Sequence, residues 1–133
     1  LSAEPDIVVV THDALSEGRV ELVKGKSPES KRYVELAGAP DLVVEVLRDS
    51  SVKKDTERLF AQYYAAGVLE YWLIDARGDD LFLQIHHRGA SGFKRVAKDK
   101  EGYQRSKVLE SRFRFEREED RNETWFYSLT QKE

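Results

Sequence analysis

The sequence contains no cysteine and no methionine, and only three histidines and three prolines occur among its 133 residues. Without cysteine, the protein has no disulfide, no cysteine-ligated zinc site, no iron–sulfur cluster and no thiol nucleophile. This composition fits a cytoplasmic location. The absence of methionine, together with a start at Leu1 in a polar segment, predicts that further residues precede Leu1 in the natural protein.

Neither a large excess of positive charge nor a long apolar run is present. The 22 Lys+Arg and 25 Asp+Glu residues leave a net charge of −3, so DNA contact would depend on a local basic patch. The longest apolar runs, Ile7–Val10 and Leu42–Val44, are far shorter than the roughly 20 residues that span a bilayer, and no membrane partner is expected. The length predicts one domain over residues 1–133.

Two short β-branched segments, each opened by the dipeptide Pro-Asp, predict strands at Pro5–Thr11 and Pro40–Leu47. Their continuous apolar character is typical of strands that are buried on both faces. The segment between them, residues 12–39, is rich in glycine, serine and charge. It predicts a long loop with one short element at Arg19–Val23.

After Leu47 the apolar residues recur at helical spacing, which predicts an amphipathic helix of about four turns, begun at residues 49–51 and ended at Gly67. Leu69–Asp75 then predicts a strand parallel to Pro40–Leu47. Later alternation of apolar and polar residues predicts antiparallel strands at 81–87, 92–97, 112–116 and 124–129. The expected fold class is α/β, with a β-β-α-β core followed by additional antiparallel strands.

Carboxylates are the strongest candidates for chemistry. Glu45 lies within an apolar strand, where a carboxylate is costly unless it is paired, hydrogen-bonded or bound to a metal. Asp41 points to the same face but lies about 13 Å away along the strand, too far to share an ion. If the two Pro-Asp strands pair antiparallel, Asp6 lies beside Glu45. Such a pair suits Mg²⁺ or Mn²⁺ and predicts metal-assisted attack of water on a phosphodiester.

Simpler interpretations of these acidic residues stay open. Asp6 and Asp41 could each open a strand by bonding nearby amides, and for Asp41 this is the favoured interpretation. Glu45 could reach solvent or pair with Lys53 or Arg48.

The histidines and aromatic residues are expected to be structural. His86 and His87 cannot share a metal, because neighbouring side chains of a strand point to opposite faces. Tyr71-Trp72 and Trp125-Phe126-Tyr127 are expected to pack in the core and the sheet instead of stacking nucleobases.

Several segments, in order and spacing, resemble one family: Pro5–Val10, Pro40–Leu47, Asp49–Ser51, Asp55, Tyr63, Ala66–Val68, Glu70–Asp75 and, more loosely, Gly102–Ser106 and Phe113. They are similar to the Uma-two family of restriction-endonuclease-like proteins, which belongs to the PD-(D/E)XK nuclease superfamily. The resemblance implies a restriction-endonuclease-like αβββαβ core, whose first helix and strand would precede Leu1. It also implies a Mg²⁺-dependent endonuclease that acts on DNA.

By resemblance, Asp6 is the first aspartate of the nuclease motif and Glu45 is the acidic residue of its second half. The motif lysine is missing, because Leu47 stands two residues after Glu45 and Leu59 stands at the alternative position on the helix. Arg58 could stand in for the lysine, but it is displaced by about 100° of helical rotation and stays protonated, which makes it a poor base.

Lys53 and Lys54, at the start of the same helix, could contact a phosphate.

Three functions remain open. The first is a DNA endonuclease with a divalent metal on Asp6 and Glu45. The second is a nuclease fold that has lost catalysis and serves as a binding or interaction module, with a homodimer as one form, and the missing lysine favours it. The third is an inert structural part of a larger assembly.

Overall fold

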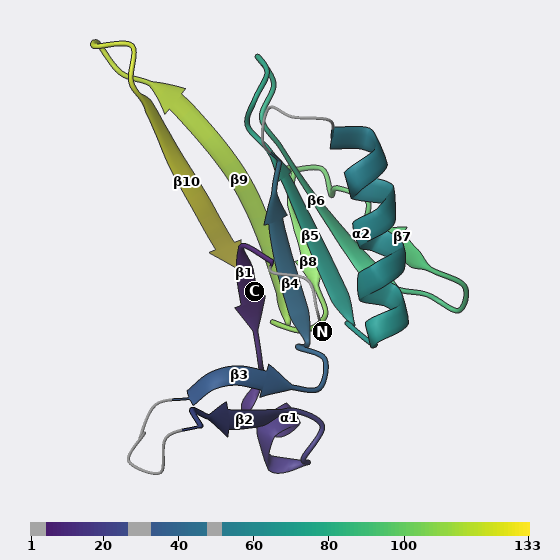
Figure 1. Ribbon diagram of the computed structural model, residues 1–133. Coiled ribbons are helices and arrows are strands. Elements are labelled where there is room, and N and C mark those ends of the chain that lie inside the picture. The colour runs from purple at the N-terminus through teal and green to yellow at the C-terminus, as the bar shows by residue number, and fades with distance from the viewer. Residues whose placement is uncertain (1–4, 27–32, 48–51) are drawn as a thin grey trace.

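The computed structural model describes residues 5–26, 33–47 and 52–133. Its largest sheet has five strands in the order β1-β4-β5-β6-β7 (Figure 1). In chain order these strands are β1 (Ile7–Val9), β4 (Leu42–Val46), β5 (Glu70–Asp75), β6 (Phe82–Arg88) and β7 (Phe93–Arg95). Helix α2 (Val52–Ala66) connects β4 to β5 and covers one face of the sheet.

The pairing within this sheet confirms the expected α/β class. β4 and β5 are parallel, with Val43 opposite Tyr71, as a strand–helix–strand crossover requires. β1 runs antiparallel to β4, with Ile7 opposite Val44. This mixed sheet, with its parallel pair and covering helix, is consistent with a restriction-endonuclease-like fold.

Successive residues of β4 and β5 alternate between two apolar clusters, because neighbouring side chains of a strand point to opposite faces. The cluster beneath α2 contains Val43, Tyr63, Val68, Tyr71 and Leu73. The cluster on the other face contains Leu42, Val44, Trp72, Leu83, Ile85 and Phe113. Tyr71 and Trp72 are therefore core residues, as expected.

Helix α2 ends where the sequence predicts. Gly67 follows Ala66 with a φ of +98°, a left-handed conformation that favours glycine. The expected capping residues at 49–51 lie outside the described residues.

The segment between the Pro-Asp strands has more regular structure than expected. It contains helix α1 (His12–Ser16) and a hairpin of β2 (Glu21–Lys24) and β3 (Tyr33–Ala37). The short element predicted at Arg19–Val23 corresponds to strand β2, whereas helix α1 and strand β3 were not predicted. The Thr11 side chain caps α1 by accepting a hydrogen bond from the Ala14 backbone at 3.1 Å. The loop was predicted because the region is rich in glycine and serine, and this composition obscured the pattern of its short strands.

The prediction that both Pro-Asp strands are buried on both faces is correct for most of β4 and wrong for β1. Leu42, Val43 and Val44 are buried, whereas the side chain of Ile7 is 53% exposed. β1 is a three-residue strand at the sheet edge, and an edge strand has a neighbour on one side only.

The last part of the chain forms a separate three-stranded sheet, in the order β10-β9-β8. Its strands are β8 (Gln104–Ser106), β9 (Ser111–Glu119) and β10 (Trp125–Lys132). β9 and β10 are longer than predicted, and β8 was not predicted. Trp125, Phe126 and Tyr127 were expected to be packed, but their side chains are 44%, 58% and 49% exposed.

A buried carboxylate links the two larger sheets. Glu70 of β5 is 1% exposed and accepts hydrogen bonds from Trp72 Nε1 (2.7 Å), Ser106 Oγ (2.5 Å) and the Lys107 backbone N–H (2.8 Å). Trp72 belongs to β5, whereas Ser106 and Lys107 lie at the end of β8, so the hydrogen bonds of Glu70 connect the two sheets.

Among the described helices, neither is long and apolar enough to cross a membrane.

Candidate functional site

The two acidic residues of the predicted pair lie next to each other at the β1–β4 edge. Asp6 directly precedes β1, and Ile7 is opposite Val44 in the antiparallel register, so Asp6 lies beside Glu45. The Asp6 Oδ2 atom accepts a hydrogen bond of 2.8 Å from the Val46 backbone N–H. This bond ties the Asp6 side chain to the end of β4.

Glu45 faces helix α2. It follows two residues after Val43, which packs in the cluster beneath the helix, and it is half-buried. The hydroxyl group of Tyr63, on α2, donates a hydrogen bond to Glu45 Oε1. The carboxylate in the apolar strand therefore has a buried neutral partner from the helix.

Tyr63 serves as a donor and not as a base. Burial, the hydrogen bond to Glu45 and the negative charges of Glu45 and Asp6 all raise the pKa of the Tyr63 hydroxyl. Because the proton stays on the tyrosine, its hydrogen bond holds Oε1 in a fixed position at neutral pH.

Tyr71 supplies a second buried hydroxyl near the acidic pair. Its side chain is fully buried, and its hydroxyl oxygen has no hydrogen-bond partner within the described residues. Burial raises the pKa of this hydroxyl, and so do the charges of Glu45 and Asp6. An unpartnered buried donor costs free energy, so this hydroxyl marks a place where an additional polar group would be stabilised.

Asp6 and Glu45 offer oxygen donors of the kind that a hard divalent cation prefers. In the described part of the chain, no group of three or more His, Cys, Asp or Glu side chains is arranged to hold a metal ion. A cation here would take Asp6 and Glu45 as charged ligands and complete its shell with backbone carbonyls and water. Mg²⁺ and Mn²⁺ accept such a shell, because they prefer oxygen and Mg²⁺ retains several waters.

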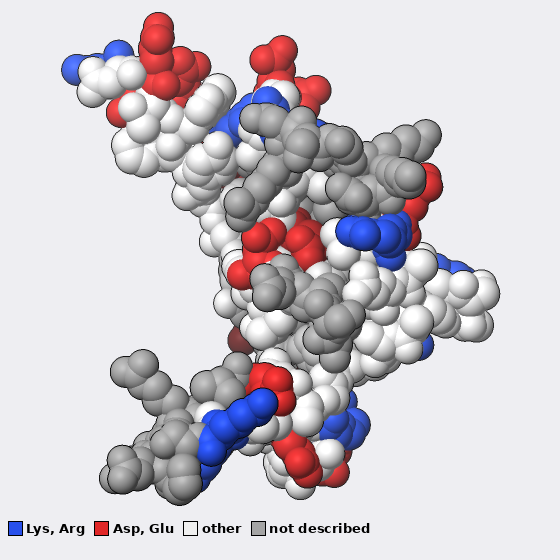
Figure 2. All heavy atoms as spheres, viewed as in Figure 1, with Lys and Arg blue, Asp and Glu red and all other residues white. Residues whose placement is uncertain are grey.

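The surface at this edge is acidic. Figure 2 shows acidic atoms gathered where β1 begins beside β4, with basic atoms close by over α2. A cation is attracted to such a concentration of negative charge, and a phosphate is attracted to the basic atoms.

Three basic residues of α2 are candidates to replace the motif lysine. Arg58 lies on α2 and is exposed. Lys53 and Lys54 fall in the first turn of α2, but their side chains lie outside the described residues. Leu47 and Leu59 pack against the apolar cluster beneath α2, so neither family position for the lysine carries an amine.

Asp41 is separate from the acidic pair. It is 2% exposed and binds Thr11 through the backbone N–H (2.9 Å) and the hydroxyl (3.1 Å). It also accepts a hydrogen bond of 3.1 Å from Arg19 Nη1. These contacts join β4 to α1 and to the start of the β2–β3 hairpin, which is a structural role.

The contacts of Asp41 predict an acid-sensitive contribution to stability. Burial alone would raise the pKa of Asp41, but the hydrogen bonds from Thr11 and Arg19 outweigh it and lower the pKa below its ordinary value. A carboxylate with a lowered pKa in the folded state stabilises the protein above its unfolded pKa of about 3.9, and this stabilisation is lost as the pH falls through the folded pKa. Asp41→Asn should therefore cost about 1–3 kcal/mol of unfolding free energy at pH 7.

Urea unfolding over a pH series measures this effect. The difference between wild type and Asp41→Asn should narrow as the pH falls below about 4. A difference that is constant from neutral to acidic pH would show that the charge of Asp41 contributes nothing.

The two histidines lie apart, as expected. His86 faces α2, with Nδ1 at 3.3 Å from the Tyr71 carbonyl oxygen, whereas His87 Nε2 lies 2.9 Å from the Arg105 carbonyl oxygen. Burial lowers the pKa of His86, so its ring is neutral at pH 7.

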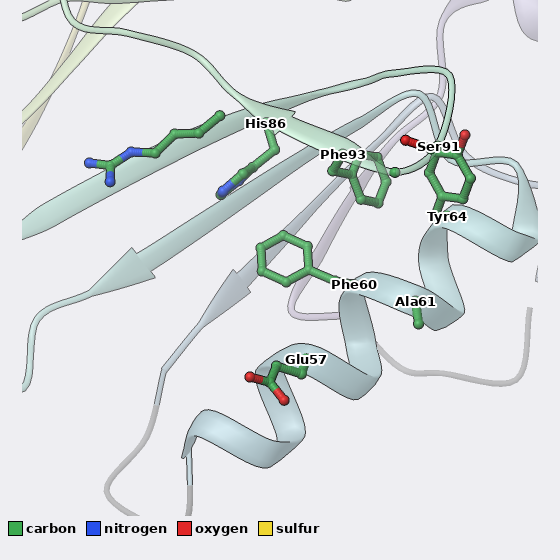
Figure 3. A pocket seen from close by; sticks show the side chains of 9 residues that line it. Glu57, Phe60, Ala61, Tyr64, His86, Ser91 and Phe93 are labelled. Atoms are coloured by element: carbon green, nitrogen blue, oxygen red, sulfur yellow. The ribbon is translucent and has the colours of Figure 1, made fainter.

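A cavity of about 560 Å³ lies between α2 and the β6–β7 hairpin. Figure 3 shows Phe60, Tyr64 and Phe93 as its aromatic walls, with His86 and Glu57 at its sides. Among the described side chains, Glu57 is the one carboxylate in this lining. The cavity therefore lacks the paired acids of the β1–β4 edge, and a hard cation fits it less well.

The two tyrosines, Tyr63 and Tyr71, were not predicted as site residues. Tyr63 and Tyr71 were taken as apolar core positions and as parts of a family resemblance. A signal was available, because a buried tyrosine hydroxyl usually has a polar partner, and a strand carboxylate was present to supply one. Which tyrosine faces Glu45 depends on the rotation of α2 over the sheet, which spacing alone does not give.

Residues 1–120 match the Uma2 family model, whose description is "Putative restriction endonuclease". A search of curated proteins found no match.

Proposed function

This chain belongs to the Uma2 family, and on that premise we propose that it is a DNA endonuclease that hydrolyses phosphodiesters with Mg²⁺ or Mn²⁺. The family description supports a nuclease at the level of the family. The observation that carries the metal-dependent form is the position of Asp6 beside Glu45, at the β1–β4 edge. We propose a cytoplasmic location with it.

In this proposal, Asp6 and Glu45 hold the cation. When bound, the cation would neutralise charge on the attacked phosphate and lower the pKa of nearby water. The Val46 backbone N–H positions the Asp6 carboxylate, and the Tyr63 hydroxyl positions Oε1 of Glu45. Both carboxylates are thereby oriented before the cation arrives, which reduces the cost of ordering them.

The other residues act on water and on phosphate. The Tyr71 hydroxyl stays protonated and acts as a hydrogen-bond donor to a water molecule at the site. This hydrogen bond orients the water. Arg58 offers positive charge to the phosphate, and as a permanently protonated group it serves as a positioning charge. Lys53 and Lys54 would make further phosphate contacts.

A specific observation favours the second function, a binding module without catalysis. Leu47 and Leu59 pack in the apolar cluster beneath α2, so the lysine that the family uses to orient or activate water has no counterpart at either place. The expected homodimer would be one form of such a module, and the strand best suited to form it is β10.

Plasmid nicking by the full-length protein separates these two functions. With Mg²⁺ or Mn²⁺, wild type should nick supercoiled DNA, and chelation should stop the reaction. Asp6→Asn should lower the rate by at least about 100-fold, because it removes one of two charges that hold the cation.

Glu57→Gln is the matched control. It neutralises an exposed carboxylate of α2 that lines the aromatic cavity and leaves the acidic pair intact, so it should cleave like wild type. Absence of metal-dependent nicking in wild type, or equal activity of wild type and Asp6→Asn, would favour the binding module.

A further inference from the structure

β10 is an exposed strand at the edge of its sheet. The sheet order β10-β9-β8 gives it one neighbour, and Figure 1 shows the tip of the β9–β10 hairpin projecting from the body of the protein. Arg117 of β9 ties the hairpin to the β5–β6 turn through the Ala76 and Gly78 carbonyls. The large side chains of β10 are about half exposed: Phe126 is 58%, Leu129 54%, Tyr127 49% and Trp125 44% exposed. One face of Trp125 packs against Arg117, and Tyr127 packs against Phe115 of β9. Apolar side chains gathered on one exposed edge are uncommon on monomeric proteins.

The alternation of antiparallel hydrogen bonds identifies the backbone groups that face outward. The Asp120 N–H donates to the Thr124 carbonyl at 2.9 Å, so the even-numbered residues of β10 bond to β9 and the odd-numbered residues face away. The outward residues are Trp125, Tyr127, Leu129 and Gln131. Within the described ranges, none of their backbone groups bonds to another segment.

The usual protections of an edge strand are missing from β10. Monomeric proteins shield such edges with prolines, bulges, charged side chains or short strands. β10 has eight residues, no proline and one charged side chain, Lys132, and it pairs with β9 in an uninterrupted register. By contrast, β1, an edge of the central sheet, has only three residues.

We propose that β10 pairs antiparallel with the same strand of a second copy of this chain, which forms a two-fold homodimer with a continuous six-stranded sheet. A second copy is the partner that this edge fits best, because an antiparallel strand is complementary to itself across a two-fold axis. The inference does not depend on nuclease activity, because it uses no residue of the acidic site.

One register satisfies all four outward residues. It places Tyr127 opposite the partner's Leu129 and Trp125 opposite the partner's Gln131, so each outward backbone group meets a partner group. The Tyr127 and Leu129 side chains then form apolar cross-strand pairs. Lys132 lies opposite the partner's Thr124, so no like charges meet within the paired strands. Ser128 lies on the two-fold axis.

The oligomeric state of the full chain tests the dimer. Light scattering on the eluted protein should give twice the chain mass of 15.4 kDa. Leu129→Pro removes an outward N–H without breaking a bond to β9, so it should give a monomer with unchanged circular dichroism. Leu22→Lys, at a 41% exposed position of β2, is the control and should remain dimeric.

A disulfide tests the register, because the chain has no cysteine of its own. Ser128 would meet the partner's Ser128 as a non-hydrogen-bonded pair with Cα atoms about 4.5 Å apart, within the range that a disulfide spans. Ser128→Cys should therefore cross-link readily under mild oxidation. Phe126→Cys should not, since its two copies would stand about 13 Å apart.

A monomeric wild type at all concentrations would overturn the proposal. A dimer that persists in Leu129→Pro, or in which Phe126→Cys cross-links as fast as Ser128→Cys, would also overturn it, by placing the interface or the register elsewhere.

Discussion

Replacing Glu45 with glutamine should abolish the binding of Mn²⁺ measured by calorimetry. Asp6 and Glu45 are the two carboxylates at the β1–β4 edge, and the described residues offer no third acidic or histidine ligand arranged to hold a metal with them. An amide keeps the shape of the side chain and an oxygen for Tyr63, but it carries no charge. We expect the affinity for Mn²⁺ to fall by more than about 100-fold. Residues that only orient a metal ligand typically change the affinity by about 10- to 100-fold, so this loss would be larger.

Two further variants provide an intermediate effect and a control for the calorimetry. Tyr63→Phe removes the hydrogen bond to Glu45 Oε1 and keeps both charges, so it should weaken Mn²⁺ binding by about 10- to 100-fold. Glu57→Gln changes one carboxylate of α2 outside the pair and should bind like wild type. Unchanged affinity in Glu45→Gln would remove the metal site from the proposed function.

Glu70→Ala should have the largest effect on stability. Its carboxylate is the acceptor for Trp72 Nε1, Ser106 Oγ and the Lys107 N–H, and its removal leaves these donors buried without a partner. Each unsatisfied buried donor costs about 1–3 kcal/mol, and loss of a buried charged acceptor costs roughly 3–5 kcal/mol in total. The melting temperature of a chain of this length should fall by more than about 10 °C.

Thermal unfolding followed by circular dichroism measures this change. Glu118→Ala, at an exposed position of β9, is the control and should stay within about 0.5 kcal/mol of wild type. A melting temperature for Glu70→Ala close to that of wild type would mean that water replaces the carboxylate and that these hydrogen bonds between the sheets contribute little.

The local pattern of the sequence was sufficient for the central elements. Continuous β-branched residues indicated β4 and β5, helical spacing indicated α2, and Gly67 marked its end. The neighbouring position of Asp6 and Glu45 also followed from sequence, because antiparallel pairing of two Pro-Asp strands brings the start of one beside the end of the other. Their role in metal binding remains a prediction.

Other features could not be read from local pattern. Residues 12–39 were expected to form mainly a loop with one short element, because glycine and serine are typical of loops. The structure has two short strands there, which stabilise each other by pairing. Trp125, Phe126 and Tyr127 were expected to be packed, because aromatic residues usually are. Their exposure arises because β10 lies at a sheet edge, and edge position is a property of the whole topology.

By itself, the sequence of this protein determined the type of its central elements and the pair of acids at one end of them, because side-chain periodicity and turn residues act over a few positions. Only the tertiary structure decided which groups meet these acids and which surfaces stay open. The packing of α2 against the sheet brings the Tyr63 hydroxyl to Glu45 and leaves the Tyr71 hydroxyl without a partner, and the strand order leaves β10 with one neighbour. Such contacts join residues far apart in the chain, so they depend on how whole elements pack.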